Sequence, residues 1–407
     1  MVVKALGFAG ISAKRGPSGP TKTPPKKVNL SERLANYAAI EKYRKRPLLV
    51  YATSTRPGVV AMMASDAVRE FVDQIDRLPN ISREVDVLIH SSGGDALTAW
   101  KLMSILRERF DDISVLVPFA AFSAATIFSL GADQIVMHPH ASLGPIDPQI
   151  STQTSDGKTI NFSYEDLGAF LRFLKLEANI ETEEQVTEVV AKLFSTIDPI
   201  RVGAAKRASE LSTSVGERLL LTHMKRWRDR GKAKKIAENL NKSFFAHGDA
   251  VSRTRAREFG LRIAPSDPQL EALIWGAYLG IESYMEIRRP FDYLQHFLSN
   301  PAGAQSLIPP APINIPPGMP PQLVQQILQQ AATQAVGHQP VLVDFNLVCA
   351  LMESIRLASE VRAIGQVAVQ RQPPSQFQVS VTFTSSRWDN VPIPPIATDN
   401  PPAGPAT

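Results

Sequence analysis

Residues 85–150 read VDVLIHSSGGDALTAWKLMSILRERFDDISVLVPFAAFSAATIFSLGADQIVMHPHASLGPIDPQI, and this stretch decides the fold. It opens with an apolar run over 85–90 that stops at Ser91-Ser92-Gly93-Gly94. Short apolar runs that end in turn residues are typical of buried parallel strands. Two further apolar runs follow at 113–119 and 132–137, and a helical pattern precedes each of them. This alternation predicts a largely parallel sheet with helices on its faces.

Two features fall at the carboxyl ends of the predicted strands. The first is the pair Gly93 and Gly94, whose backbone can turn sharply and approach another group closely. The second is Ser123, which opens the helix after the second strand and is followed by Ala124. A hydroxyl nucleophile beside backbone N–H donors is half of an acyl-transfer site. Without further context, a serine in this place is more often a helix N-cap than a nucleophile.

The stretch resembles the Clp-protease/crotonase fold and, within it, the serine dehydrogenase proteinase and signal peptide peptidase A-like serine proteases. Ile-His-Ser-Ser-Gly-Gly-Asp is similar to their oxyanion segment, and Phe-Ser-Ala-Ala-Thr is similar to their nucleophile segment. The most specific likeness lies at 132–149, which is typical of the serine dehydrogenase proteinase branch. The resemblance covers roughly residues 45–265. It implies an α/β fold and a serine endopeptidase with Ser123 as nucleophile and an oxyanion hole of Gly93, Gly94 and Ala124.

The same resemblance implies a general base, and the relatives differ in which residue provides it. Clp proteases place a histidine after the serine, but the matching region here, residues 143–148, contains none. Signal peptide peptidase A-like enzymes use a lysine from the following loop or helix, which makes Lys158 the first choice and Lys175 the second. Such a lysine must be buried to lose its proton near neutral pH, so an exposed Lys158 would contradict the assignment. Three histidines could line the site: His138, His140 and His247.

Two other hypotheses remain beside the peptidase. Many relatives have Ser-Gly-Gly around the nucleophile, whereas this chain has Ser-Ala-Ala at 123–125. Alanine keeps its N–H, so activity is compatible with the change, but a catalytically silent scaffold or binding protein is an alternative. A crotonase-type acyl-CoA enzyme is a third hypothesis, although crotonases need no serine at this helix start. We expect no cofactor or metal, because zinc-ligand spacings, P-loops and dinucleotide-binding glycine patterns do not occur.

Charge and composition separate the body of the chain from its ends. The formal net charge is +5, but Lys4, Lys14, Arg15, Lys22, Lys26 and Lys27 lie within residues 1–31 without any acidic residue. The body is therefore close to neutral, and we expect no specific nucleic-acid partner. We expect the following segments: a disordered basic tail at 1–30, a protease domain at 31–265, a helical extension at 266–300, a proline-rich linker at 301–321, a small C-terminal α/β unit at 322–390 with a helix over 347–364, and a disordered tail at 391–407.

Partners and location follow from cysteine use, hydropathy and the resemblance. The single cysteine, Cys349, excludes an internal disulfide framework and fits a reducing compartment, so we expect a cytoplasmic protein. No apolar run approaches the length of a membrane span. The resemblance implies a peptide or protein substrate and a homo-oligomer, for which the apolar stripes of the helical stretch 182–240 offer a surface.

Overall fold

The computed structural model describes residues 28–79, 81–153, 158–226, 228–242, 250–308, 318–336, 341–372 and 376–394. Its centre is a mixed sheet with the strand order β12-β11-β10-β1-β2-β3-β5, and β13 pairs with β11. The neighbouring strands β1 (Leu48–Thr53), β2 (Glu84–His90), β3 (Asp112–Val117) and β5 (Gln134–Met137) are parallel. The mostly parallel sheet predicted for residues 47–137 is therefore confirmed.

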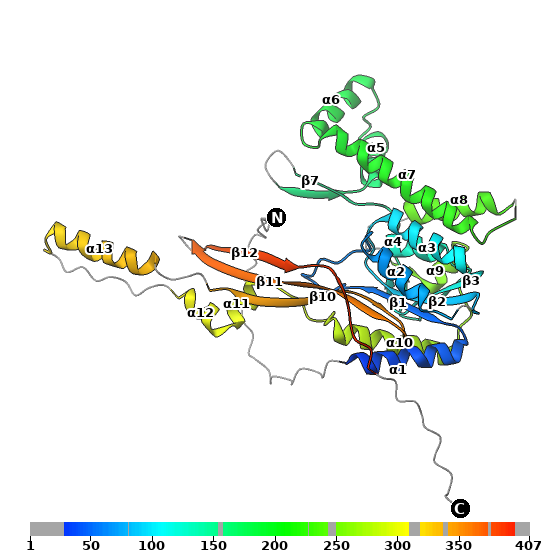
Figure 1. Cartoon of the computed structure of the whole chain (residues 1–407). Helices are drawn as coiled ribbons and strands as arrows, with labels where there is room; N and C mark the ends of the chain where they lie inside the picture. Colours follow the sequence, from blue (N-terminus) through cyan, green and yellow to red (C-terminus); the bar gives the residue numbers. More distant parts are fainter. Residues whose placement is uncertain are drawn as a thin grey trace, which may run out of the picture.

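Helices cover both faces of this parallel part, as Figure 1 shows. One face carries α2 (Ala67–Asp76), α3 (Ala96–Arg109), α4 (Ala124–Leu130) and the end of α7 (Pro199–Leu221). The other face carries α1 (Leu30–Arg44) and α10 (Pro268–Tyr284). Because both faces are covered, the strands are continuous apolar runs rather than alternating ones.

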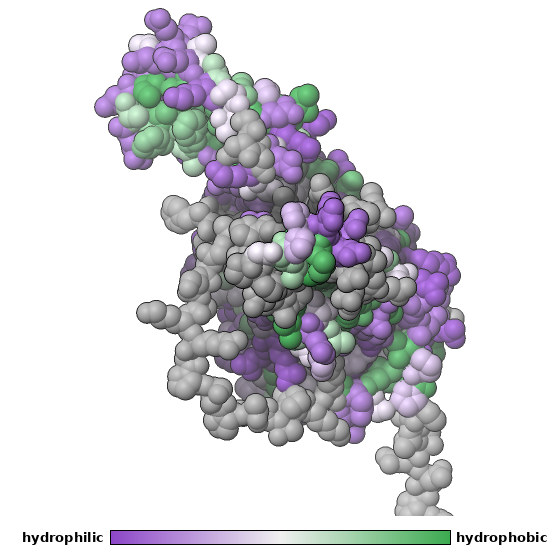
Figure 2. All heavy atoms as spheres, turned by 90° about the vertical axis from the view of Figure 1, so that its left-hand side faces the viewer, coloured by the Kyte–Doolittle hydropathy of each residue, from purple (hydrophilic) through white to green (hydrophobic). Residues whose placement is uncertain are grey.

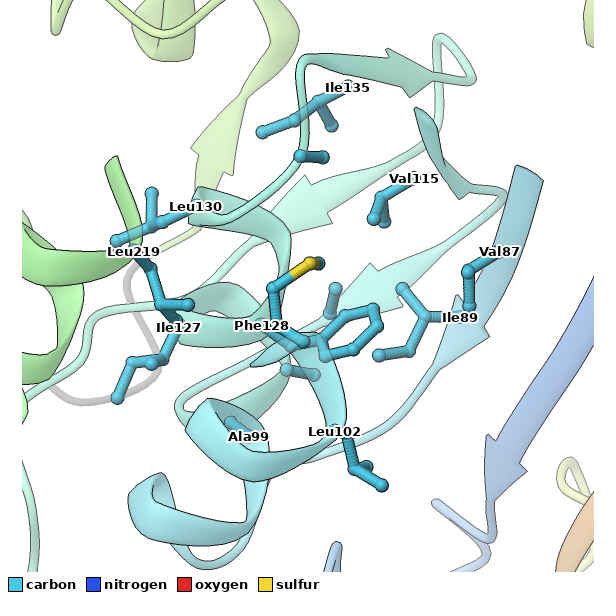
Figure 3. Close-up of a cluster of buried hydrophobic side chains, with 14 of the residues drawn as sticks. Val87, Ile89, Ala99, Leu102, Val115, Ile127, Phe128, Leu130, Ile135 and Leu219 are labelled. Carbon is cyan, nitrogen blue, oxygen red and sulfur yellow. The ribbon is translucent and has the colours of Figure 1, made fainter. Parts of the chain in front are cut away.

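The core beneath α3 and α4 lies directly behind the strand ends that carry the candidate site. Figure 3 shows the ring of Phe128 on α4 lying toward Val87 and Ile89 of β2, with Leu102 of α3 close by. Each of these side chains is at most 1% exposed, and burying one of them stabilises the fold by about 1.5–3 kcal/mol. This packing fixes α4, and with it the turn that precedes the helix.

The C-terminal strands extend the same sheet. β10 (Val343–Glu353), β11 (Ala358–Gln372) and β12 (Gln376–Ser385) run antiparallel, and β10 pairs with β1. β13 (Trp388–Asn390) adds to β11. The helix predicted over 347–364 is wrong, because this stretch forms most of a β-hairpin. Its leucines, alanines and glutamates favour a helix locally, but pairing along the open edge of β1 outweighs that preference.

A helical arm projects from the body beside α4, at the top of Figure 1. It consists of the hairpin β7 (Ile150–Gln153) and β8 (Thr159–Phe162), then α5 (Tyr164–Leu176), α6 (Glu183–Phe194) and the first half of α7. Its own core is small and centres on Phe162, Leu167, Ile197 and Ala205, and α6 contains no buried residue. Several apolar side chains are consequently exposed on the arm, and Figure 2 shows them gathered at its projecting end.

The other elements complete the body and its extensions. A small sheet joins β4 (Ala120–Ala121), β6 (Ser142–Leu143) and β9 (Val251–Ser252). The remaining helices are α8 (Asp229–Lys242), α9 (Arg253–Glu258), α11 (Tyr293–Ser299), α12 (Pro301–Ser306) and α13 (Pro321–Val336). The tails expected at 1–30 and 391–407 fall largely outside the described residues. No helix in the described ranges is long and apolar enough to cross a membrane.

Candidate active site

The end of β2 is joined to β4, and this pairing fixes where Ser123 lies. The N–H of Ser91 donates to the carbonyl of Ala120, and the N–H of Phe122 donates to the carbonyl of Ser91, both at 3.0 Å. Ser123 follows Phe122 directly, so two backbone hydrogen bonds hold the chain immediately before it. The turn after β2 and the turn before α4 are thereby brought together, as expected for adjacent strands of a parallel sheet.

Gly93 packs directly against Ser123. Its φ angle is +109°, and a Cβ added to it would lie 2.6 Å from the Cβ of Ser123 and 2.7 Å from the carbonyl oxygen of Phe122. Both distances are shorter than side chains tolerate, and the backbone conformation itself favours glycine. Only a residue without a side chain lets the two turns approach this closely. The contact that the sequence predicted between the glycine pair and the serine is therefore present.

Ser123 does not cap its helix. The side chain of this N-cap residue accepts no hydrogen bond from the first turn of α4, and its backbone has φ 50° and ψ −117°. A residue with a side chain in so sparsely populated a conformation costs about 1–3 kcal/mol and persists only where the surroundings enforce it. Sharp strand-to-helix turns of this kind present a serine hydroxyl in nucleophile elbows. The uncapped, strained turn argues against the N-cap interpretation.

Thr126 provides part of that enforcement. Its fully buried Oγ1 lies 2.7 Å from the carbonyl oxygen of Ala121 and 2.9 Å from that of Gly144, and it accepts the N–H of Gly144 at 3.1 Å. One hydroxyl thus connects α4, β4 and the loop after β6. The turn at Ser123 is therefore held in place both by β4, which precedes it, and by the loop after β6.

Backbone N–H groups near Ser123 divide into used and unused donors. The N–H of Gly93 donates to Ser91 Oγ at 3.0 Å, and that hydroxyl is in turn 2.7 Å from Thr53 Oγ1. The N–H groups of Gly94 and Ala124 donate to no acceptor among the residues that the structure describes. Gly93 therefore approaches Ser123 through its backbone while its N–H is used, and the N–H groups of Gly94 and Ala124 stay without an acceptor in the described part of the chain. Sequence reasoning missed Ser91 and Thr53, although a polar residue directly after a buried strand was a usable signal.

Residues 59–162 match the ClpP-like SDH-type serine proteinase family. Over this span, which is less than half of the chain, the sequence is similar to that family. The match includes the glycine pair, Ser123 and Lys158, and it confirms the predicted Clp-protease-like fold, a mostly parallel sheet with flanking helices.

Curated proteins and solved structures are also similar to this chain. Two uncharacterized proteins of Methanocaldococcus jannaschii are similar. MJ1495 is 26% identical, and the match covers 47% of this chain and 56% of MJ1495. MJ0137 is 38% identical, and the match covers 17% of this chain and 24% of MJ0137. The chain thus spans about half, or less, of the length of these curated relatives. Similar solved structures include the 1510-N membrane-bound stomatin-specific protease (13% identity, 55% of this chain and 82% of that one, TM-score 0.31). Another is ClpP1 from Listeria monocytogenes (13% identity, 57% of this chain and 97% of that one, TM-score 0.28).

The expected lysine bases both lie on the arm and are exposed. Lys158 immediately precedes β8, and Lys175 is near the end of α5. Neither is buried, so neither meets the condition set for a neutral lysine in this single-chain arrangement. The Oγ of Ser123 makes no hydrogen bond within the described ranges, so the structure does not bring it together with either predicted base.

The expected histidines lie apart from Ser123 or outside the described residues. His138 is 8% exposed and stacks on Trp275, with ring centroids 4.7 Å apart, and its Nδ1 accepts the N–H of His140 at 3.1 Å. Burial, followed by the neighbouring His140, lowers the pKa of His138. These two histidines therefore belong to an aromatic cluster against α10. His247 lies outside the described residues.

A fourth histidine, which sequence reasoning did not select, ends β2. His90 is fully buried, its Nε2 is 3.1 Å from Thr55 Oγ1, and its ring centroid is 5.1 Å from that of Tyr278. Burial lowers the pKa of His90 to about 4, so its ring is neutral near pH 7. In the described part of the chain, no three side chains of His, Cys, Asp or Glu gather to hold a metal ion.

Proposed function

We propose that this protein is a serine peptidase that hydrolyses peptide bonds through an acyl-enzyme on Ser123. The observation that carries the proposal is the strained, uncapped turn at Ser123 in direct contact with Gly93. A structural serine at a helix start would use its hydroxyl for the first turn, and this one does not. The family match over 59–162 supports the same class of reaction.

The chemistry follows from the groups around the serine. Ser123 Oγ attacks the scissile carbonyl, loses its proton to a base, and forms a tetrahedral intermediate whose oxyanion the N–H groups of Gly94 and Ala124 stabilise. Collapse expels the amine, which takes up a proton, and water then releases the acyl group by the same route. Losing one oxyanion donor typically raises such a barrier by about 3–4 kcal/mol.

The exposure of Lys158 and Lys175 contradicts their assignment as the base within a single chain, and we propose that one of them, Lys158 first and Lys175 second, acts as the base only where assembly buries it. An exposed lysine stays protonated near neutral pH, so the proposal requires that the arm pack against another copy of the chain and bury it. Exposed apolar side chains on the arm support such packing: Leu171, Phe173, Leu176, Phe194 and Ile200. If activity rises with protein concentration and Lys158→Met abolishes it without changing assembly, this assignment holds.

Labelling with a fluorophosphonate probe tests the nucleophile. We expect the unmodified protein and a Ser129→Ala variant to be labelled, and Ser123→Ala to remain unlabelled. Ser129 is a matched control because it lies on the same helix, is buried, and donates only to the carbonyl of Ala125, at 2.8 Å. Cleavage of denatured casein should follow the same pattern.

The exposure of both lysines favours one rival, a catalytically silent scaffold. Absence of labelling in a folded, assembled protein would support that rival and contradict the peptidase.

A further inference from the structure

An apolar pocket of ≈390 Å³ opens next to the glycine turn, outside the groups that would perform the chemistry. One wall is the segment around Val60 and Met62, and the other is formed by the C-terminal strands. The C-terminal wall includes Cys349, Val361, Phe383 and Trp388. The volume of the pocket is in the range of pockets that hold small ligands or large side chains, roughly 300–1,000 Å³. More than half of the described residues that line this C-terminal pocket therefore lie beyond the 59–162 family match.

The segment that forms the first wall is bonded to the candidate site. Met63, between the pocket residues Met62 and Ala64, donates its N–H to the carbonyl of Gly93 at 2.7 Å, and its own carbonyl accepts the N–H of Asp95 at 2.9 Å. A Cβ on Gly94 would lie 2.2 Å from the Met63 carbonyl oxygen. One residue thus separates the pocket wall from the turn that touches Ser123.

The same segment, which belongs to no helix or strand, has unpaired backbone groups. The backbone groups of residues 60–62 make no hydrogen bond within the described ranges, although their neighbours Val59 and Met63 do. Val60 and Met62 are 84% and 62% exposed, which is unusual for large apolar side chains beside a pocket. Unpaired backbone groups beside exposed apolar side chains can pair with an extended chain that lies along them.

The residues that line the pocket also determine which kind of side chain can bind in it. Among the lining residues that the structure describes, Asp66 carries the one charge, and its Oδ2 accepts the indole N–H of Trp388 at 2.9 Å. A basic side chain could pair with Asp66 alone, an acidic one would face its like charge, and the other described lining residues are uncharged and mostly apolar. Uncharged apolar side chains therefore fit best.

We propose that residues 60–62 and the C-terminal pocket bind an extended peptide rich in uncharged apolar side chains. Main-chain pairing along 60–62 would supply affinity, and the pocket would hold one apolar side chain and so set specificity. Continuity with the glycine turn through Met63 identifies this peptide as the substrate, so the inference rests on the proposed peptidase function. The C-terminal strands thereby select substrates as well as extend the sheet.

Binding is measured on the Ser123→Ala protein, which cannot turn the peptide over. The probe is fluorescein-labelled Thr-Leu-Thr-Leu-Thr-Leu with a C-terminal amide, and the control peptide has Glu in place of each Leu. We expect the leucine peptide to bind about tenfold or more tightly than the glutamate peptide, and Met62→Asp to weaken it by about tenfold or more, since one apolar contact is replaced by a charge. Val60→Asp is the second variant, and both positions are exposed, so the fold should persist.

The matched control is Ile81→Asp, an exposed apolar position (95%) outside the pocket lining, where affinity should change less than about twofold. Alkylation of Cys349, the only cysteine, should also slow when the leucine peptide is bound. Equal binding of both peptides, no binding of either, or unchanged affinity in both aspartate variants would overturn the inference. If the unmodified protein binds but does not cleave the leucine peptide, the peptidase proposal fails while the docking site stands. If it cleaves casein with unchanged KM in Met62→Asp, the docking site fails while the peptidase stands.

Discussion

Replacing Ser123 with alanine and, separately, with glycine distinguishes the roles this residue could have. Because its side chain makes no cap hydrogen bond, Ser123→Ala should avoid the ~1 kcal/mol that losing an N-cap typically costs. We expect its free energy of unfolding to stay within about 0.5 kcal/mol of the unmodified protein. Turnover of a denatured protein substrate should fall to background, since the nucleophile is gone.

Glycine at the same position should also relieve backbone strain. The conformation at φ 50°, ψ −117° costs a residue with a side chain about 1–3 kcal/mol, and glycine adopts it freely. Against this gain stands the larger conformational freedom of unfolded glycine, roughly 0.5–1 kcal/mol. Ser123→Gly should therefore be more stable than Ser123→Ala by about 1 kcal/mol, and equally inactive.

Thermal unfolding and casein cleavage, measured on the same samples of all three proteins, provide the assay. If Ser123→Ala loses about 1 kcal/mol and keeps its turnover, the residue is a cap and the reasoning fails. A glycine variant less stable than the alanine variant would show that the turn is not strained.

Other predictions concern the glycine turn, pH and assembly. Gly93→Ala should lower the free energy of unfolding by more than about 2 kcal/mol and abolish cleavage, because the new Cβ meets Ser123 and the positive φ strains alanine. The control is Gly203→Ala, which lies in a helix with open space around it and should leave stability unchanged or raise it. Burial lowers the pKa of His90 to about 4 in the folded chain. Between about pH 6.5 and pH 4 the unfolded chain therefore binds a proton that the folded chain does not bind, and the free energy of unfolding decreases as the pH falls through that window. His90→Phe should remove about 2–3 kcal/mol of the stability difference between about pH 7 and about pH 4.5. The protein should sediment as a homo-oligomer, and Leu176→Glu, at a 72% exposed position on the arm, should shift it to smaller species.

Each of these has a contradicting result. A Gly93→Ala protein with normal cleavage would separate the glycine turn from the site. An unchanged pH dependence of unfolding in His90→Phe would mean that the imidazole is not held neutral by burial. A monomer at micromolar protein concentration would contradict the predicted assembly, and with it the route by which Lys158 becomes buried.

The sequence alone determined the parallel half of the sheet. It also determined that Gly93 and Ser123 lie together, because each follows one of two neighbouring parallel strands. Short apolar runs at 85–90, 113–119 and 132–137 are typical of strands covered on both faces, and the structure contains these strands. In a parallel sheet the carboxyl ends of neighbouring strands meet at one edge. The contact between Gly93 and Ser123 follows from that rule, which is why it could be predicted without a structure.

Only the tertiary structure decided how the donors, bases and C-terminal strands are used. Whether the N–H of Gly93 or Gly94 is free depends on Ser91, whose hydroxyl takes the first of them. Whether Lys158 is buried depends on how the arm packs, and in the single chain it is exposed. Residues 347–364 have helix-favouring composition and became strands because the open edge of β1 offered backbone hydrogen bonds. Local patterns specify which face of an element is apolar, but pairing partners, proton positions and pockets depend on residues far apart in the chain, and only folding brings these together.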